Sequence, residues 1–170
     1  VSGPQTPVPV ASLTKLMTAY VILHDHPLAA NEPGPNITVT QADVDDYNND
    51  TVSDDSNAQV AVGEQITELQ VLEGLLIHSA DNYADLLATW DAGSIPAFVA
   101  KMNATAARLG MHQTHFADAN GVMPQSMSTA GDILKVAGPD MTNPVVASIV
   151  RNTAVTLPVA GTISTYTPLL

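Results

Sequence analysis

VPVASLTKLMTA, residues 8–19, is the stretch of sequence that decides the fold of this chain. It places Ser12 and Lys15 three residues apart, and residues at this spacing share one face of a helix, so that hydroxyl and amine can meet. Lys15 is the only lysine or arginine before Lys101, and its surroundings are apolar. The apolar neighbours are Val10, Leu13, Leu16 and Met17. Burial disfavours the charged form of an amine, and a neutral Lys15 is able to take the proton of Ser12.

The spacing therefore predicts a serine nucleophile activated by a lysine base, as in Ser-x-x-Lys acyl-transfer chemistry. The alternative is structural. The four-residue pattern Ser-x-x-Lys is common in proteins. Ser12, which follows Pro9, also fits a helix N-cap with a solvated lysine one turn later.

Composition limits the classes of protein to which the chain can belong. Its 170 residues suffice for one domain with a hydrophobic core, and 45% apolar with 13% charged residues excludes disorder. A net charge of −12 argues against nucleic acid as a partner, because phosphates need lysine and arginine. The absence of cysteine excludes a disulfide scaffold and a thiolate zinc site. We see no apolar run of membrane-spanning length and no signal peptide in this sequence.

We expect no metal site and no cofactor. His24 and His26, and likewise His112 and His115, lack a convincing third ligand nearby, and helix-end or surface positions explain them better. The acidic run at residues 43–55 lacks the glycine and glutamate of a calcium loop, so we interpret it as a solvated loop.

The apolar periodicity and the capping residues predict mostly helices and only short strands. We expect the first eleven residues to be extended, strands near 37–39 and 57–62, and a brief helix from Thr40. A capping box at Thr67 and Gln70 opens a helix that stops near Ser79. The other expected elements are helices over 12–24, 82–90, 94–109 and from 128 or 129 through 137, and a hairpin over 153–167 that turns at Gly161.

A second polar motif, Ser79-Ala80-Asp81-Asn82, falls in the break between two of these helices. Buried hydroxyl and amide groups at such a junction need partners, and the wall of an active site supplies them. Alternatively, Ser79 ends one helix and Asp81 caps the next.

Taken in order, these segments resemble the serine D-Ala-D-Ala carboxypeptidases, the low-molecular-mass penicillin-binding proteins of the β-lactamase-like superfamily. The resemblance covers nearly the whole chain. Its segments are residues 8–19, 62–67, 75–82, 102–103, 109–111, 114–116, 120–121 and 128–130.

The resemblance implies a role for each matching residue. Ser12 would be the acylated nucleophile, Lys15 its base, and Ser79 the relay that delivers a proton to the leaving amine. The family usually has Ser-x-Asn, whereas Asp81 stands here two residues after Ser79 and Asn82 three after. Either Asp81 replaces the amide that binds the substrate, or a local shift brings Asn82 into that place. An ionised aspartate cannot donate a hydrogen bond to the substrate carbonyl.

The third motif of the family, Lys-Thr/Ser-Gly on a strand, is missing from this sequence, and residues 166–170 look like the segment just before it. We therefore expect an α+β, transpeptidase-like fold represented mainly by its helical part, with the central antiparallel sheet largely missing. Residues 1–170 would form a single fragment of the transpeptidase domain that lacks the N-terminal strands and the third-motif strand. The fragment alone would be inactive, and a further chain segment would complete the sheet.

For the intact protein, the resemblance implies a serine-type D-Ala-D-Ala carboxypeptidase or endopeptidase. It would cut peptidoglycan stem peptides ending in D-Ala-D-Ala outside the cytoplasm, secreted or membrane-associated, and β-lactams would inhibit it covalently. One alternative is a non-catalytic remnant that binds cell-wall peptide or a partner protein. A serine β-lactamase is a weaker alternative, because no glutamate follows Ser79 to serve as the deacylating base.

Overall fold

The computed structural model describes residues 3, 5–50 and 56–165, and within them the chain divides into two compact units. The first unit comprises Val1–Pro27 and Ala88–Asn143, and the second comprises Leu28–Leu87 and Pro144–Leu170. Helix α4, Asp81–Ala92, contributes residues to both units. The expected segment at residues 166–170 lies outside the described residues.

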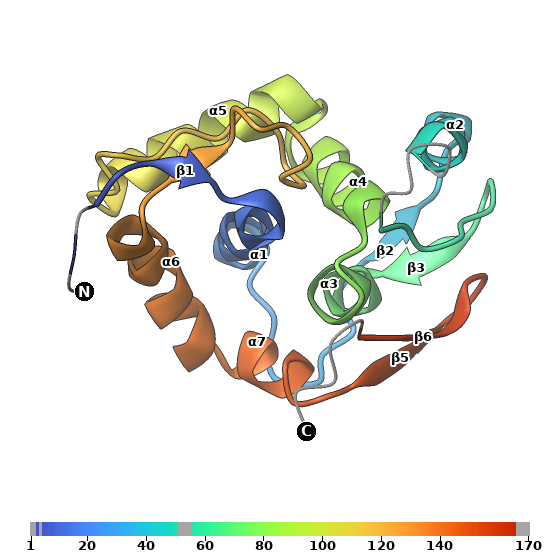
Figure 1. Cartoon of the computed structure of the whole chain (residues 1–170). Helices are drawn as coiled ribbons and strands as arrows, with labels where there is room; N and C mark the ends of the chain where they lie inside the picture. The colour runs from blue at the N-terminus through green and yellow to red at the C-terminus, as the bar shows by residue number, and fades with distance from the viewer. Residues whose placement is uncertain (1–2, 4, 51–55, 166–170) are drawn as a thin grey trace. The chain divides into compact units, whose positions relative to one another are not determined.

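Helix α1, Thr14–Asp25, is the centre of the first unit, where it packs against α5 and α6 (Figure 1). The other elements of this unit are β1 Val8–Pro9, the 3₁₀ turn η1 Ala11–Leu13, α5 Ile95–Arg108, β4 Met127–Ser128 and α6 Ala130–Thr142. Helix α1 is apolar nearly all round, which suits a helix enclosed by neighbours. Ser94 caps α5 and Thr129 caps α6, as their sequences predict.

An ion-pair network ties the end of α1 to α5 in the first unit. The Lys101 ammonium lies 2.8 Å from the Asp25 carboxylate and 2.7 Å from the Asp91 carboxylate. His26 contacts the other oxygen of Asp91 at 2.9 Å, and its ring lies 4.1 Å from the Trp90 ring at a tilt of 36°. His26 is the C-cap residue of α1, so it lies at a helix end as expected.

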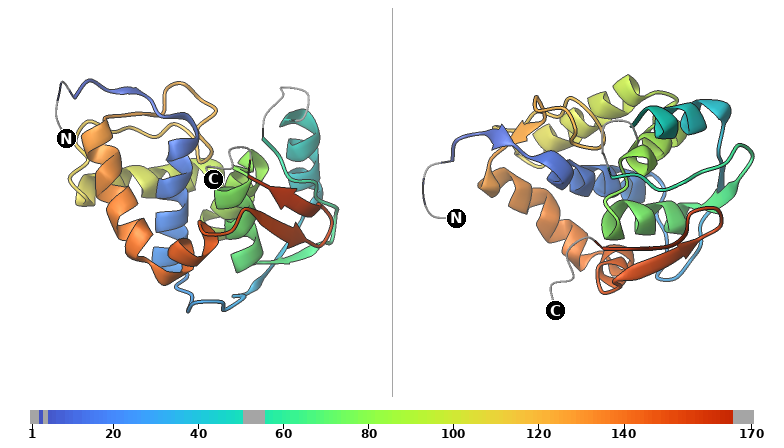
Figure 2. Two further views of the ribbon diagram at one scale, coloured as in Figure 1. Left: turned by 60° about the horizontal axis from the view of Figure 1, so that its bottom comes forward. Right: turned by 45° about the vertical axis from the view of Figure 1, so that its right-hand side comes forward.

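In the second unit, α3 packs against strand β5 and helix α7, and Figure 2 shows the hairpin of β5 and β6 beside α3. The elements of this unit are β2 Asn36–Thr38, α2 Gln41–Asp50, β3 Gln65–Thr67, α3 Glu68–Ile77, the first part of α4, α7 Pro144–Ile149, β5 Ala154–Leu157 and β6 Gly161–Ser164. The predicted capping box of α3 is present, with Thr67 and Gln70 bonding each other's backbone amide. Helix α4 lies so close to α3 that a Cβ atom on Gly74 would come within 2.5 Å of the Tyr83 ring.

Each described sheet has only two strands, and all three pairs are antiparallel: β1 with β4, β2 with β3, and β5 with β6. This confirms a helical α+β architecture with little sheet.

The structure corrects several local expectations. Residues 57–62 are not a strand, and β2 pairs instead with Gln65–Thr67, next to the capping box. The brief helix expected from Thr40 extends to Asp50, so the first part of the acidic run is helical, with polar side chains on an exposed surface. Neither α7 nor the pairing of β1 with β4 was expected, because a two-residue strand carries no periodicity.

Candidate active site

Ser12 and Lys15 come together at the start of α1. Ser12 lies in the 3₁₀ turn, and Lys15 in the first turn of the α-helix, so the backbone brings the side chains to one side. The Lys15 Nζ lies 3.2 Å from the Ser12 Oγ. The residue at the N-cap of α1 is Leu13, and no side chain caps this helix. The structural alternative, in which Ser12 caps the helix and Lys15 is solvated, is therefore wrong.

Lys15 is almost completely buried, with 2% of its surface exposed, as its sequence neighbours predict. Val10 and Met17 are buried with it, whereas Leu13 is half-exposed and does not belong to the enclosing set. The buried amine also donates a hydrogen bond of 2.8 Å to the backbone carbonyl of Asn120. A lysine amine can form more than one hydrogen bond, so Lys15 can bind this carbonyl and the Ser12 hydroxyl at the same time.

The loop of residues 117–126 carries Asn120, and several hydrogen bonds fix it to the elements that hold Ser12. Thr18 of α1 donates to the Ala119 carbonyl at 2.6 Å, and the Val10 amide donates to the Ser126 carbonyl at 3.0 Å. Within the loop, buried Asp118 accepts hydrogen bonds from the Ser126 hydroxyl at 2.5 Å and from the Met123 amide at 2.6 Å. The position of the Asn120 carbonyl is thus set by a buried polar network.

Gly121 allows this loop to approach Ser12 closely. Its φ is +91°, and a Cβ atom there would lie 1.9 Å from the Ala11 carbonyl oxygen. Ala11, directly before Ser12, itself has a φ of +47°. Positive φ at a residue other than glycine costs free energy and is concentrated at functional sites. The turn that presents Ser12 is therefore strained and is held from outside by residues 120–121.

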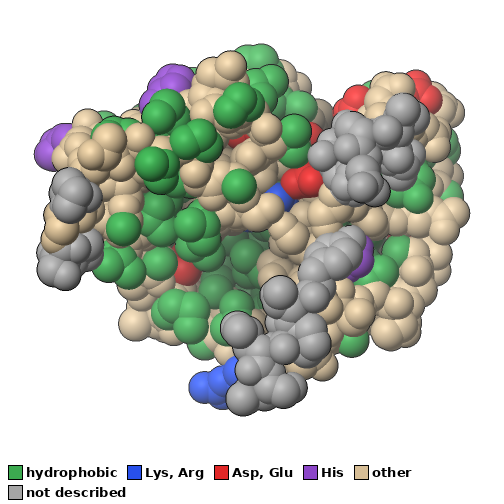
Figure 3. Space-filling view, in the orientation of Figure 1, with side chains coloured by type: hydrophobic (Ala, Val, Ile, Leu, Met, Phe, Trp, Pro, Cys, Tyr) green, Lys and Arg blue, Asp and Glu red, His purple; other side chains and the backbone are tan. Residues whose placement is uncertain are grey.

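Figure 3 shows apolar side chains gathered over β1 and the 117–126 loop. This apolar rim consists of Val8, Leu13, Val122 and Met123, each about half-exposed. All four residues belong to the segments that carry Ser12 and Asn120. The rim offers apolar surface to a ligand bound at Ser12.

The second motif lies in the second unit, at the junction of α3 and α4. Ser79 has a φ of +59° and is partly buried. Asp81 is the first residue of α4, and its carboxylate accepts a hydrogen bond of 3.1 Å from the Ser56 amide. Ser79 directly follows His78, the C-cap of α3, and a left-handed residue at this place is a common way for a helix to end, so its backbone also fits the structural alternative.

Asn82 is held differently from Asp81. Its side-chain oxygen accepts from the Ala58 amide at 3.0 Å, and its amide group donates to the Ala58 carbonyl at 2.8 Å. Its own backbone amide donates to Asn57 at 3.1 Å. Asn82 thereby fastens the start of α4 to residues 57–58. The side chains of Asp81 and Asn82 thus both hold residues 56–58, and both residues are buried.

The sequence predicted Ser12, Lys15, Ser79 and Asp81 as site residues but assigned no role to Asn120 and Gly121. Asn120 contacts Lys15 through a backbone carbonyl 105 residues along the chain, which no side-chain pattern marks. The only signal was the Asn-Gly pair itself, a turn former. No group of three or more metal-ligating side chains occurs among the described residues. In the described part of the chain, no helix is both long and apolar enough to cross a bilayer.

Comparison with known proteins identifies the relatives of this chain. Residues 2–156 match the model of the D-alanyl-D-alanine carboxypeptidase family, peptidase family S11. A D-alanyl-D-alanine endopeptidase of Haemophilus influenzae is 35% identical over 76% of this chain and 41% of its own length. A D-alanyl-D-alanine carboxypeptidase of a Streptomyces species is 32% identical over 85% of this chain and 50% of its own length.

A solved structure shows the same fold. The crystal structure of D-alanyl-D-alanine carboxypeptidase from Mycobacterium tuberculosis is 30% identical and superimposes with a TM-score of 0.82, covering 98% of this chain and 60% of that one. The chain thus spans about half the length of the curated relatives it matches. The expected fold, the helical part of a transpeptidase-like α+β domain, is confirmed. This chain belongs to the D-alanyl-D-alanine carboxypeptidase family of serine peptidases.

Proposed function

We propose that the intact protein is a serine-type D-Ala-D-Ala peptidase that works through an acyl-enzyme on Ser12. The observation that carries this proposal is the contact of 3.2 Å between a buried Lys15 amine and the Ser12 hydroxyl, on a turn strained by Ala11. A pure binding domain needs neither a buried lysine next to a serine nor strain at that serine.

In this mechanism the neutral Lys15 amine donates one hydrogen to the Asn120 carbonyl and accepts the Ser12 proton. The Ser12 oxygen attacks the carbonyl carbon of the penultimate D-alanine, and the bond to the terminal D-alanine nitrogen breaks. Ser79 relays the proton that Lys15 took from Ser12 to that nitrogen, and the terminal D-alanine leaves. Water then hydrolyses the ester and restores Ser12. The apolar rim supports the acyl part of the peptide, and Asp81 faces its amide.

The same chemistry explains the proposed partners. A β-lactam presents a strained amide to Ser12, and its opened ring stays attached, so that the acyl-enzyme accumulates. The proposed substrate, a peptidoglycan stem peptide ending in D-Ala-D-Ala, places the site outside the cytoplasm, in a secreted or membrane-associated protein. The proposed single transpeptidase domain would be completed by strands beyond residues 1–170.

The test measures release of D-alanine from a synthetic peptide ending in D-Ala-D-Ala, using the intact protein, its Ser12→Ala variant and Ser164→Ala as a matched control. Ser164 is exposed on β6, and the substitution keeps the backbone carbonyl that contacts His78. We expect activity in the wild type and in the control, and none in Ser12→Ala.

Activity that survives in Ser12→Ala would contradict the proposal, and an inactive wild type that still binds the peptide would identify a non-catalytic remnant. A chromogenic cephalosporin distinguishes the peptidase from the remaining alternative, a serine β-lactamase. Release of one equivalent of chromophore indicates a trapped peptidase, whereas steady turnover indicates a β-lactamase.

A further inference from the structure

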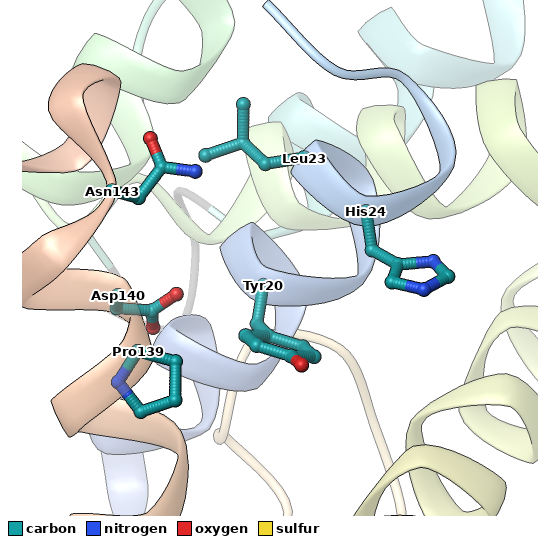
Figure 4. A pocket seen from close by; sticks show the side chains of 6 residues that line it. All are labelled: Tyr20, Leu23, His24, Pro139, Asp140 and Asn143. Carbon is teal, nitrogen blue, oxygen red and sulfur yellow. The ribbon is translucent and has the colours of Figure 1, made fainter.

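A pocket of about 150 Å³ opens between α1 and α6 in the first unit. Tyr20, Leu23 and His24 line it from α1, and Pro139, Asp140 and Asn143 from the end of α6 (Figure 4). Its volume is large enough to hold several water molecules or a small organic molecule. None of these residues takes part in the peptidase mechanism proposed for Ser12.

Asp140 is the unusual residue of this pocket. Only 2% of its surface is exposed, and its Oδ2 atom is buried with no hydrogen-bond partner. Figure 4 shows its carboxyl group pointing from α6 toward the Tyr20 ring on α1. A buried carboxyl oxygen without a partner costs free energy unless something binds it, so such a group in a native structure needs an explanation.

The lining defines the chemistry of a ligand that would satisfy Asp140. The carboxylate selects a positively charged hydrogen-bond donor, and the Tyr20 ring offers a face to a cation. Leu23 and Pro139 are apolar and suit a short hydrocarbon body. A metal ion fits poorly, since the pocket supplies one carboxylate and one amide, and the His24 Nδ1 already contacts Asp25 at 2.8 Å.

We propose that this pocket, the Asp140 pocket, binds a small organic ammonium ion, with the ammonium group against the Asp140 carboxylate and the hydrocarbon part against Leu23 and Pro139. The site is separate from Ser12 and Lys15 in its residues and does not depend on the function proposed for them.

The electrostatics of the pocket agree with this assignment. Burial raises the pKa of Asp140 to about 8 when nothing is bound. A cation must therefore displace a proton at neutral pH, so the affinity should rise as the pH increases from 6 to 9. Besides Asp140, the titratable residues lining the described pocket are Tyr20 and His24, both on α1.

The experiment uses the intact protein and n-butylammonium chloride as the probe, with n-butanol as its uncharged counterpart. Binding is followed by NMR through the backbone amides of Tyr20, Leu23 and Asn143. The matched variants are Asp140→Asn, which removes the charge while keeping the shape, and Asp45→Asn, the same change on the exposed surface of α2. Circular dichroism verifies that each variant is folded.

We expect saturable shifts of these amides with n-butylammonium and none with n-butanol. Asp140→Asn should weaken binding by about tenfold or more, because a charge-assisted hydrogen bond is lost, and Asp45→Asn should leave it unchanged. Wild-type affinity should increase at least about tenfold from pH 6 to pH 9, and it should do so also in His24→Gln.

Four results would overturn the proposal: no saturable shift at the pocket, equal binding of n-butanol, unchanged binding in Asp140→Asn, or a pH dependence that disappears in His24→Gln. A signal showing that Asp140 is ionised at pH 6 in the free intact protein would overturn it as well, because another part of that protein would then already neutralise the carboxyl group.

Discussion

At the scale of single residues, Lys15 differs from every other cation of the chain because it is buried next to a hydroxyl. Its partners, Ser12 and the Asn120 carbonyl, both lie within hydrogen-bond distance of one nitrogen. An ammonium that only anchors the loop and an amine that also accepts a proton share this geometry. Substitution by arginine separates the two roles, since a guanidinium keeps its charge but is not deprotonated in proteins.

We predict that Lys15→Arg lowers the rate of acylation by a fluorescent penicillin about 10²-fold or more, the scale of a lost general base. The fold should survive, as checked by circular dichroism. Lys135→Arg is the control, because Lys135 is exposed on α6 and its ammonium contacts the Gly110 carbonyl and Asp132. Acylation of Lys15→Arg at the wild-type rate would show that the lysine is only an electrostatic anchor.

A second residue-scale prediction separates Asp81 from Asn82. Asp81→Asn keeps an oxygen for the Ser56 amide and adds a donor for a substrate carbonyl, so acylation should be unchanged or faster. Asn82→Ala removes both side-chain hydrogen bonds to Ala58 and leaves buried backbone groups without partners. It should therefore lower the free energy of unfolding by about 1–3 kcal/mol.

Chemical denaturation and penicillin acylation, normalised to the folded fraction, measure both effects. If folded Asn82→Ala is not acylated while Asp81→Asn behaves like the wild type, the second motif is shifted by one residue and Asn82 faces the substrate.

At the scale of elements, the sequence predicted those whose signals are local. Helices α1, α3, α4, α5 and α6 and the hairpin of β5 and β6 were expected from periodicity, caps and a turn glycine, and all are present. The contact of β1 with β4 was not predictable, because Val8 pairs with Ser128 across most of the chain and each strand has two residues. For the same reason the contact of Lys15 with the Asn120 carbonyl was missed, although its contact with Ser12, three residues away, was predicted.

The 117–126 loop is the element on which the site depends most. We predict that Gly121→Ala lowers the free energy of unfolding, because the added Cβ meets the Ala11 backbone. Overpacking a core typically costs about 1–3 kcal/mol, and we expect a larger loss here. Acylation should be lost even where thermal melting shows folded protein. Gly138→Ala in α6 is the matched control, because nothing lies within 4 Å of its Cβ position, and a helical alanine is favoured by about 1 kcal/mol. Equal acylation of the two variants would contradict this role of the loop.

Helix α3 begins with a buried acid that should make stability depend on pH. Glu68 is fully buried, and neither of its carboxyl oxygens has a partner. Burial, with a smaller contribution from Glu32, raises the pKa of Glu68 from 4.5 to about 7. Between these values the unfolded chain has released the proton while the folded chain retains it, so this group makes stability fall as the pH rises from about 4.5 to 7.

We therefore predict that Glu68→Gln raises the melting temperature relative to the wild type more at pH 8 than at pH 5. Glu73→Gln on the same helix is the comparison: burial also raises the pKa of Glu73, but this residue is only partly buried, so the change should have the same sign and be smaller. A Glu68→Gln effect of the same size at both pH values would show that Glu68 is ionised in the folded protein or has a partner.

At the scale of the whole molecule, composition excluded several classes of protein but did not indicate a reaction. A net charge of −12 and the absence of cysteine are shared by many unrelated domains. The family was indicated by motifs occurring in order along the chain, and the match to the family model over residues 2–156 confirms it. The limited sheet was also expected, and each sheet among the described residues has two strands.

The central claim is that Ser12 becomes acylated, and mass spectrometry of the intact protein after incubation with benzylpenicillin tests it most directly. We predict one adduct with the mass of the whole antibiotic on the wild type and on Ser164→Ala, located on Ser12 by peptide mapping, and no adduct on folded Ser12→Ala. An adduct that persists in Ser12→Ala, or one that maps to another residue, would contradict the account.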